Sequence, residues 1–301
     1  MWTRFLGARK DPSTIALREW EVFTDARRSG AIDPRGRNVK EGNRKPIRAR
    51  PVEIDLKWLK AVLNWGTKWR TREGRYLLIE NPVRGYQILT EKNPRRPVVS
   101  EDRYEATRAV SNQVTMEIRW TSERVGQRSY FSEILDIVNG TGRRISAVCA
   151  LTYQDLDLTD GPYGSIRWPA DTDKMGHEST VPISPPVRAA IDRILRERPG
   201  IGAAPLFPSP GDPTQPMTRH LADKWLRKAE KLAGLEPQVG SLWHAYRRKW
   251  GSERKHLPDV DVAAAGGWKD TVSLKRAYQQ ADAATILSVV LNGGELREEQ
   301  A

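Results

Sequence analysis

All of the excess positive charge of this 301-residue chain lies in its first third. Residues 1–100 hold 23 lysines and arginines against 11 aspartates and glutamates, whereas residues 101–301 hold 27 of each kind. A chain of this length with so uneven a charge is expected to form two domains rather than one. The basic part is expected to bind a polyanion, most often a nucleic acid, although acidic membrane surfaces also attract basic segments.

Two segments of the basic part have the spacing of amphipathic helices. The first, residues 13–29, is expected to begin with Ser13 or Thr14 as its cap. In the second, residues 52–65, five apolar residues recur at the spacing of one helix face: Ile54, Trp58, Ala61, Val62 and Trp65. Aromatic residues at this spacing belong more often to a core, so we predict that this face is buried, with base stacking as the alternative.

A proline- and arginine-rich stretch at 94–99 predicts a linker. It separates a basic helical domain at 1–93 from a larger domain at 100–292, and a tail follows at 293–301. The expected fold class is mainly α with a small β-sheet (α+β).

The larger domain mixes helical patterns with two or three short strands between residues 153 and 183 and a proline-rich loop at 204–217. Its apolar stretch at 283–291 is expected to pack against a neighbouring subunit or against its own domain. Helices are expected at 101–114, 127–138, 144–151, 186–198, 218–233, 240–252, 259–265 and 271–279.

The composition excludes several kinds of site. A single cysteine, Cys149, excludes an internal disulfide framework and a cysteine-rich zinc site. The four histidines have no metal-ligand spacing: His177, His220, His244 and His256. With neither a membrane-length apolar run nor an apolar signal segment, we expect a cytoplasmic protein. Three acidic residues could suggest metal chemistry but are expected to form solvated surface: Asp155, Asp157 and Asp160.

Four segments of the second domain are informative only when taken together. Thr141-Gly-Arg-Arg144 places two arginines at the start of an apolar helix, where a cation suggests a nearby anion. Lys174 precedes a glycine in an expected β-hairpin. His244 and Arg247 are three residues apart and would share one helix face. Gly266-Gly-Trp268 is followed ten residues later by Tyr278.

In this order and spacing, the segments resemble the tyrosine recombinase (phage integrase) family over roughly residues 100–290. The resemblance implies a helical core-binding domain followed by the family's catalytic domain. It also implies six catalytic residues: Arg144, Lys174, His244, Arg247, Trp268 and Tyr278. Arg143 could compete with Arg144, but the family pattern Thr-Gly-x-Arg favours Arg144.

The chemistry of the family explains these residue types. Two guanidiniums would hold the non-bridging phosphate oxygens, because they bind bidentately and stay charged. The Tyr278 hydroxyl, ordinarily protonated at neutral pH, needs nearby cations or a base such as His244 in order to attack. Lys174 would protonate the leaving 5′-oxygen. The product is a 3′-phosphotyrosyl linkage, formed without a metal or another cofactor.

The implied function is therefore site-specific DNA recombination or integration, typical of a phage or another mobile element. Its partner would be double-stranded DNA, bound by a homotetramer on two sites, and a directionality factor is left open. Basic residues expected to contact the DNA are Lys57, Lys60, Lys68, Arg70, Arg72, Arg95 and Arg96.

Two departures leave alternatives open. Ala147 stands where the family usually has an acidic residue, and Arg248 stands where a second histidine is usual. Ala147 alone supports the alternative of a catalytically inactive accessory DNA-binding relative, and a type IB topoisomerase-like relaxase is a further alternative.

Overall fold

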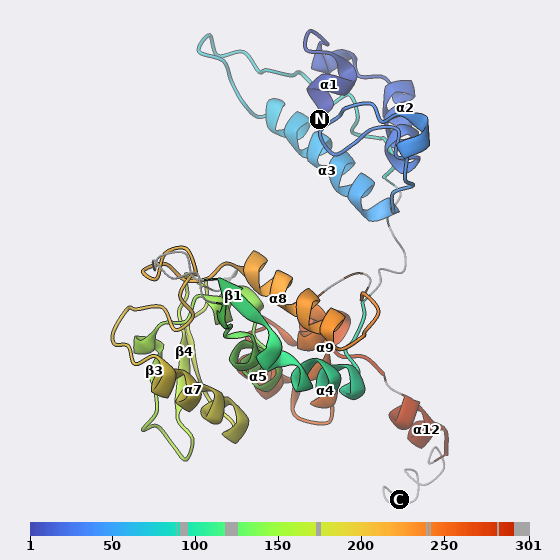
Figure 1. Cartoon of the computed structure of the whole chain (residues 1–301). Coiled ribbons are helices and arrows are strands. Elements are labelled where there is room, and N and C mark those ends of the chain that lie inside the picture. Colours follow the sequence, from blue (N-terminus) through green and yellow to red (C-terminus); the bar gives the residue numbers. More distant parts are fainter. Residues whose placement is uncertain are drawn as a thin grey trace, which may run out of the picture. The chain divides into compact units, whose positions relative to one another are not determined.

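The computed structural model of the chain describes residues 1–88, 90, 96–117, 126–172, 176–238, 240, 242–281 and 283–291. The chain divides into two compact units, Met1–Pro94 and Arg95–Ala301 (Figure 1). Each unit has a buried apolar cluster of its own. Across the described ranges, the structure contains no helix with the length and apolar character needed to cross a membrane.

The N-terminal unit has three α-helices within its described residues: α1 (Trp2–Leu6), α2 (Leu17–Arg28) and α3 (Ala49–Gly66). Short 3₁₀ turns lie between them at Pro12–Thr14 and Glu41–Asn43. Trp2 stacks on Phe23 with ring centroids 3.7 Å apart, which holds α1 against α2.

The start of α2 differs from the prediction. Ser13 and Thr14 belong to the 3₁₀ turn, and the helix begins after Ala16. There the Glu19 carboxylate accepts a hydrogen bond from the Ala16 N–H at 2.9 Å. The two hydroxyl residues instead bond back to Asp11, so they stabilise the turn rather than the helix.

The predicted buried face of α3 is wrong. Ile54, Trp58 and Trp65 are 54%, 57% and 52% exposed. The buried face consists of Val52, Leu56, Leu59 and Leu63. Both sets of residues have helical spacing, and the position of α1 and α2 selects the second one.

The C-terminal unit is mainly helical, with two small antiparallel sheets among its described residues, which confirms the predicted fold class. Its helices are α4 (Glu101–Ala109), α5 (Phe131–Thr141), α6 (Ile145–Cys149), α7 (Pro185–Glu197), α8 (Arg219–Leu232), α9 (Trp243–Glu253), α10 (Asp259–Gly266), α11 (Thr271–Ala277) and α12 (Ala283–Leu291). Its strands are β1 (Thr115–Glu117), β2 (Gly126–Arg128), β3 (Leu156–Asp157), β4 (Ser165–Trp168) and β5 (Ser179–Pro182).

The two sheets differ in how well the sequence predicts them. β3, β4 and β5 form one sheet in that order, within the segment predicted to hold short strands. Trp168 at the end of β4 pairs with Ser179 at the start of β5. β1 and β2 were not predicted, because three-residue strands are too short to show an alternating pattern.

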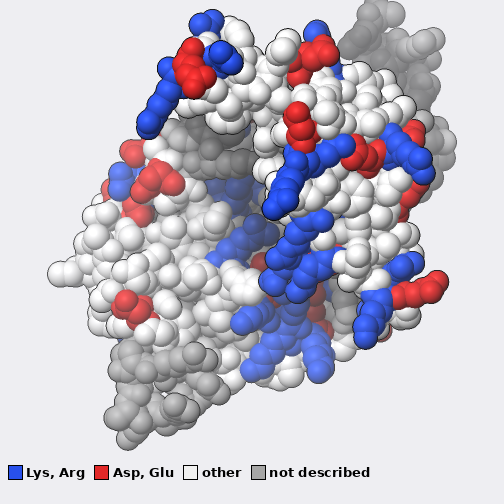
Figure 2. Space-filling view, turned by 90° about the horizontal axis from the view of Figure 1, so that it is seen from above, with Lys and Arg blue, Asp and Glu red and all other residues white. Residues whose placement is uncertain are grey.

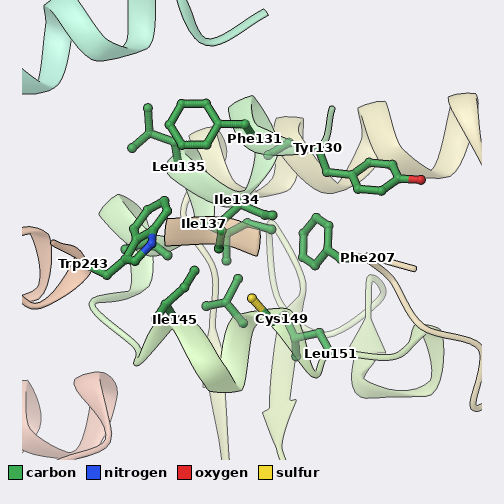
Figure 3. Close-up of a cluster of buried hydrophobic side chains, with 14 of the residues drawn as sticks. Tyr130, Phe131, Ile134, Leu135, Ile137, Ile145, Cys149, Leu151, Phe207 and Trp243 are labelled. Carbon is green, nitrogen blue, oxygen red and sulfur yellow. The ribbon is translucent and has the colours of Figure 1, made fainter. Parts of the chain in front are cut away.

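Helix α5 lies at the centre of the C-terminal core. Ile134, Leu135, Ile137 and Val138 are fully buried, so the helix is covered on several sides. Figure 3 shows Ile134, Leu135 and Ile137 of α5 among Trp243 of α9, Phe207 and residues of α6. This central helix positions the turn that follows it, which contains the two neighbouring arginines.

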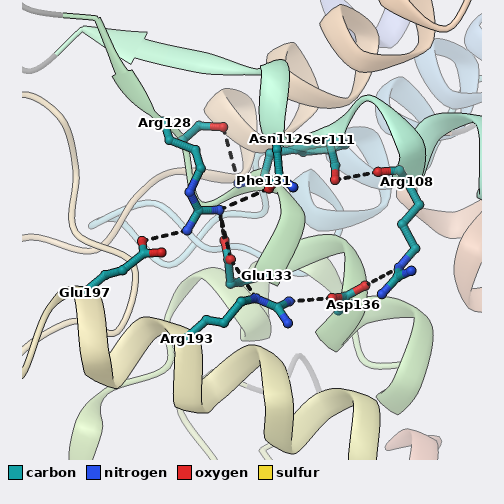
Figure 4. Close-up of polar contacts among 10 residues, drawn as sticks. Arg108, Ser111, Asn112, Arg128, Phe131, Glu133, Asp136, Arg193 and Glu197 are labelled. Atoms are coloured by element: carbon teal, nitrogen blue, oxygen red, sulfur yellow. Dashed lines mark hydrogen bonds and ion pairs between the residues drawn. The ribbon is translucent and has the colours of Figure 1, made fainter.

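Two buried carboxylates of α5 are neutralised by arginines from other elements (Figure 4). Glu133 is bound by Arg128 at 2.9 Å and by Arg193 at 3.2 Å. Asp136 is bound by Arg108 at 2.9 Å and by Arg193 at 2.7 Å. Because an unpaired buried charge is strongly destabilising, this network fixes α5 against α4 and α7.

One of the acidic residues predicted to be solvated is instead buried. Asp155 is 3% exposed and bonds the Arg167 guanidinium at 3.0 Å. It also accepts hydrogen bonds from the backbone and hydroxyl of Thr152. Its role is structural, whereas Asp157 and Asp160 are exposed as predicted.

Candidate active site

A pocket of about 500 Å³ in the C-terminal unit gathers side chains from segments far apart in the sequence. Four of the predicted catalytic residues line it: Arg144, His244, Arg247 and Tyr278. Lys174 lies outside the described residues, in the connection between β4 and β5. Two other cavities, of about 620 and 740 Å³, contain none of the predicted catalytic residues in their linings.

The turn after α5 delivers the first arginine. Gly142 ends α5 with φ 63°, a left-handed conformation that glycine adopts freely. A side chain at this position would also overlap the Trp250 indole. Arg144 then occupies the cap position of α6 and is half-buried in the pocket wall.

Arg247 is 1% exposed and is bound by main-chain carbonyls. Its Nη1 donates to the carbonyl of Gly142 and, at 2.6 Å, to that of Gly266. Its Nη2 donates to the Gly267 carbonyl at 3.3 Å. Burial lowers the pKa of this guanidinium to about 9, and repulsion from Arg144 adds to the effect, so it remains charged at neutral pH.

His244 lies one turn before Arg247 on the same face of α9, as predicted. Burial lowers its pKa to about 4, and the positive charges of Arg247, Arg248, Arg219 and Arg144 contribute further. The imidazole is therefore neutral at physiological pH and has a nitrogen able to accept a proton.

The low pKa of His244 predicts a pH dependence of stability. The unfolded histidine takes up a proton below about pH 6.5, whereas the folded one does so only near pH 4. The free energy of unfolding is therefore expected to fall as pH falls through this interval. Urea unfolding of the DNA-free protein should show a smaller fall for His244→Gln than for wild type. Identical pH profiles would contradict the assignment.

Tyr278 follows α11 and is held against α9 by main-chain contacts. The Ser252 hydroxyl donates to the Tyr278 carbonyl at 3.1 Å, and Arg248 Nε donates to the Ala277 carbonyl at 3.1 Å. The Tyr278 ring centroid lies 6.3 Å from that of His244. Arg248, noted in the sequence as a departure, thus helps to position the segment that contains Tyr278.

Trp268 packs against both the second arginine and the tyrosine. The Arg247 guanidinium lies 3.7 Å from the centroid of its ring, and the Tyr278 ring meets it edge-on at 4.9 Å. Its indole Nε1 is buried and has no hydrogen-bond partner among the described residues. Trp268 therefore shapes the back of the site chiefly by packing.

Two charged pocket residues were not singled out in the sequence. Arg219, at the start of α8, lines the pocket and lowers the pKa of His244. Asp171 lines it from the segment after β4. Neither belongs to a motif, so no sequence signal could have found them. Ala147 is buried, and its methyl group belongs to the apolar cluster of the C-terminal unit.

The predicted DNA contacts lie mostly on the N-terminal unit. Lys57, Lys68, Arg70 and Arg72 are exposed there. Lys60 is half-buried, and its Nζ lies 3.4 Å from the Tyr86 carbonyl. In the C-terminal unit, Arg96 donates to the carbonyl of Arg276, and Arg95 lies outside the described residues.

Comparison with known proteins identifies the family of the chain. Residues 105–285 match the model of the phage integrase family. The chain belongs to the phage integrase family. It is a tyrosine-type site-specific DNA recombinase, and the family match favours this function over an inactive relative or a relaxase. No curated protein sequence matches this recombinase significantly.

Solved structures show the same fold at low sequence identity. The recombinase is similar to a lambda integrase(75-356) dimer bound to a COC' core site, with TM-score 0.62, 14% identity and coverage of 94% of this chain and 90% of that one. It is similar to XerH recombinase in a post-cleavage complex with palindromic difH, with TM-score 0.61, 15% identity and coverages of 96% and 74%. The Tn1549 transposon integrase with circular intermediate DNA gives TM-score 0.57, 15% identity and coverages of 93% and 86%.

Proposed function

We propose that the 500 Å³ pocket is where this recombinase cleaves and rejoins DNA strands. The Tyr278 oxygen attacks a backbone phosphorus and forms a phosphotyrosyl bond to the 3′ end. The bond from phosphorus to the 5′-oxygen breaks, and its electron pair leaves with that oxygen. The observation that supports this proposal most is the gathering of Arg144, His244, Arg247 and Tyr278 around one pocket.

Each proposed role follows from the state of the side chain. His244 is neutral and takes the tyrosine proton. Arg144 and Arg247 bind the non-bridging oxygens, on which negative charge grows in the transition state. Lys174 gives a proton to the leaving 5′-oxygen. Trp268 packs against Arg247 and Tyr278 and so holds both side chains in place.

The N-terminal unit is proposed to be the core-binding domain, with residues 94–99 as the linker to the catalytic domain. Its basic side chains would contact backbone phosphates, which supplies affinity but little sequence preference. Lys57, Lys60, Lys68, Arg70 and Arg72 are the proposed contacts. Figure 2 shows lysine and arginine side chains gathered in a central band on the face drawn there. We place the reaction in the cytoplasm, where such DNA would be accessible.

The proposed assembly is a homotetramer on two DNA sites, and a directionality factor stays an open part of this proposal. Helix α12 supports an intersubunit contact. Five apolar side chains on it are 53–74% exposed: Ile286, Leu287, Val289, Val290 and Leu291. A helix so apolar and so exposed gains free energy by packing against another surface, and a neighbouring subunit would provide one.

Removal of α12 is expected to separate assembly from DNA binding. A chain that stops after residue 282 should bind DNA like wild type but form only lower-order complexes, because it lacks the exposed apolar helix. A chain that stops after Leu291 is the matched control, since it loses only the residues beyond α12. Native gels and sedimentation of the protein–DNA complexes give the readout. Unchanged assembly of the shorter chain would refute the intersubunit role.

Covalent capture tests the proposed function directly. The recombinase is incubated with fragments of the DNA that flanks its gene, and the reaction is quenched with detergent. Trypsin cleaves after Arg276, so mass spectrometry should find the nucleotide on the peptide that begins at Ala277. The trapped DNA should be attached through its 3′ end. A nucleotide on another peptide, or no adduct despite retained DNA binding, would overturn the proposal.

A further inference from the structure

Arg143 is a buried arginine beside the active site whose hydrogen bonds go to the protein. It is 4% exposed. Its Nε donates to the Ala265 carbonyl at 3.0 Å, and its Nη2 donates to the Ala264 carbonyl at 3.2 Å. Nη2 also donates to the Ser179 hydroxyl at 3.0 Å. At least two of its three nitrogens therefore bind protein groups, whereas a phosphate ligand would need them directed outward.

These contacts join two segments that lead into the site. Ala264 and Ala265 form the last turn of α10, directly before Gly266, Gly267 and Trp268. Ser179 begins β5, opposite Trp168 of β4, and the Arg143 guanidinium lies 5.0 Å from the Trp168 ring centroid. The connection between these two strands contains Lys174 in sequence.

Arg143 and Arg247 hold the same turn from two directions. Arg247 donates to the carbonyls of Gly266 and Gly267, while Arg143 holds the two residues before them. Gly267 has φ 70°, and a side chain there would overlap Nη1 of Arg143. The turn is thus packed directly against the Arg143 guanidinium.

From these contacts, we propose that Arg143 is a positioning residue that holds the Gly266–Trp268 turn and thereby keeps Trp268 against Arg247 and Tyr278. The proposal deepens the proposed function and rests on it for the catalytic consequence. The claim that Arg143 holds the turn concerns the DNA-free protein and does not depend on the proposed function. Charge-assisted hydrogen bonds suit this role, because they are strong and fix the direction of the groups that they join.

Hydrogen exchange tests, without DNA, whether Arg143 holds the turn. The Trp268 N–H bonds the Ala263 carbonyl at 2.8 Å, and the Gly267 N–H bonds the Ala264 carbonyl at 3.2 Å. In Arg143→Met, exchange of these two amides should rise by ~10-fold or more, since the carbonyls of this turn lose their charged partner. Arg143→Lys should restore part of the protection. Unchanged exchange in Arg143→Met would overturn the proposal. If the methionine variant does not fold, the exchange of Arg143→Lys is compared with that of wild type instead.

Strand cleavage measures the catalytic part. Arg143→Met should lower the cleavage rate by up to ~10²-fold, as small displacements of a site do, without changing the Kd for DNA or its salt dependence. In a Trp268→Ala background, Arg143→Met should lower the cleavage rate much less, because both side chains act through the same turn. Independent losses in the double variant, or a weaker salt dependence, would instead mean that Arg143 contacts phosphate. Absence of a wild-type adduct would defeat the proposed function and leave the exchange result intact.

Discussion

Tyr278→Phe is expected to abolish covalent attachment to DNA and to lower strand cleavage by ~10⁴-fold or more, as loss of a nucleophile does in other covalent enzymes. The change removes only the phenolic oxygen. The ring can keep its edge-on contact with Trp268 at 4.9 Å and its position near His244. DNA binding and folding should therefore be retained. The measurement is detergent-resistant adduct formation, together with a DNA-binding assay on the same preparation.

Two other hydroxyl groups provide the control for this prediction. Ser146 and Thr172 also line the pocket, so each is an alternative nucleophile by position. Ser146→Ala and Thr172→Val should leave adduct formation intact. An adduct that persists in Tyr278→Phe, or one that disappears in Ser146→Ala, would assign the nucleophile elsewhere.

Arg247→Ala is expected to have two separable effects. Removal of a charged donor to the transition state should lower strand cleavage by ~10²–10³-fold. The loss should also reduce stability, because the carbonyls of Gly142, Gly266 and Gly267 lose their buried partner. If the free energy of unfolding falls by about 2 kcal/mol, Tm should fall by ~4–8 °C for a domain of this size. Cleavage under single-turnover conditions and thermal unfolding measure the two effects.

Arg193→Ala is the matched control for Arg247→Ala. Arg193 binds the buried carboxylates of Glu133 and Asp136 and is not among the residues that line the pocket. This variant should lose stability but cleave at the wild-type rate when assayed well below its Tm. Equal loss of cleavage in both variants would mean that Arg247 acts only through the fold.

The proposed catalytic residues could be recognised in the sequence because each of their motifs has a short local spacing. His244 and Arg247 needed only a helix to share one face, and α9 provides it. Sequence order placed Tyr278 after α11, but its contact with α9 depends on Ser252 and Arg248, which bond to main-chain atoms. Contacts to main-chain carbonyls have no sequence signature on the acceptor side, so the roles of Arg143 and Arg248 could not be predicted.

The fold class was predictable, whereas the choice between two apolar helix faces was not. Helix α3 has apolar residues on both sides, and periodicity alone does not say which side meets α2. The larger aromatic side chains favoured the wrong face: Trp58 and Trp65 are exposed, while Leu56 and Leu59 are buried. Only the packing of the three helices resolves such a case.

Among the described residues, Arg247 has no acidic partner, and this makes the stability of the protein depend on its DNA substrate. Its hydrogen bonds to Gly142, Gly266 and Gly267 go to neutral carbonyls, and among the described residues no carboxylate forms an ion pair with it. Without DNA, the protein therefore keeps a buried cation close to Arg144, and this cost in folding free energy offsets part of the stabilisation that its carbonyl hydrogen bonds provide. A phosphodiester in the pocket would remove that cost, so DNA should act as a stabilising ligand of the C-terminal unit as well as its substrate. The enzyme is then most resistant to unfolding when a DNA phosphodiester occupies its pocket.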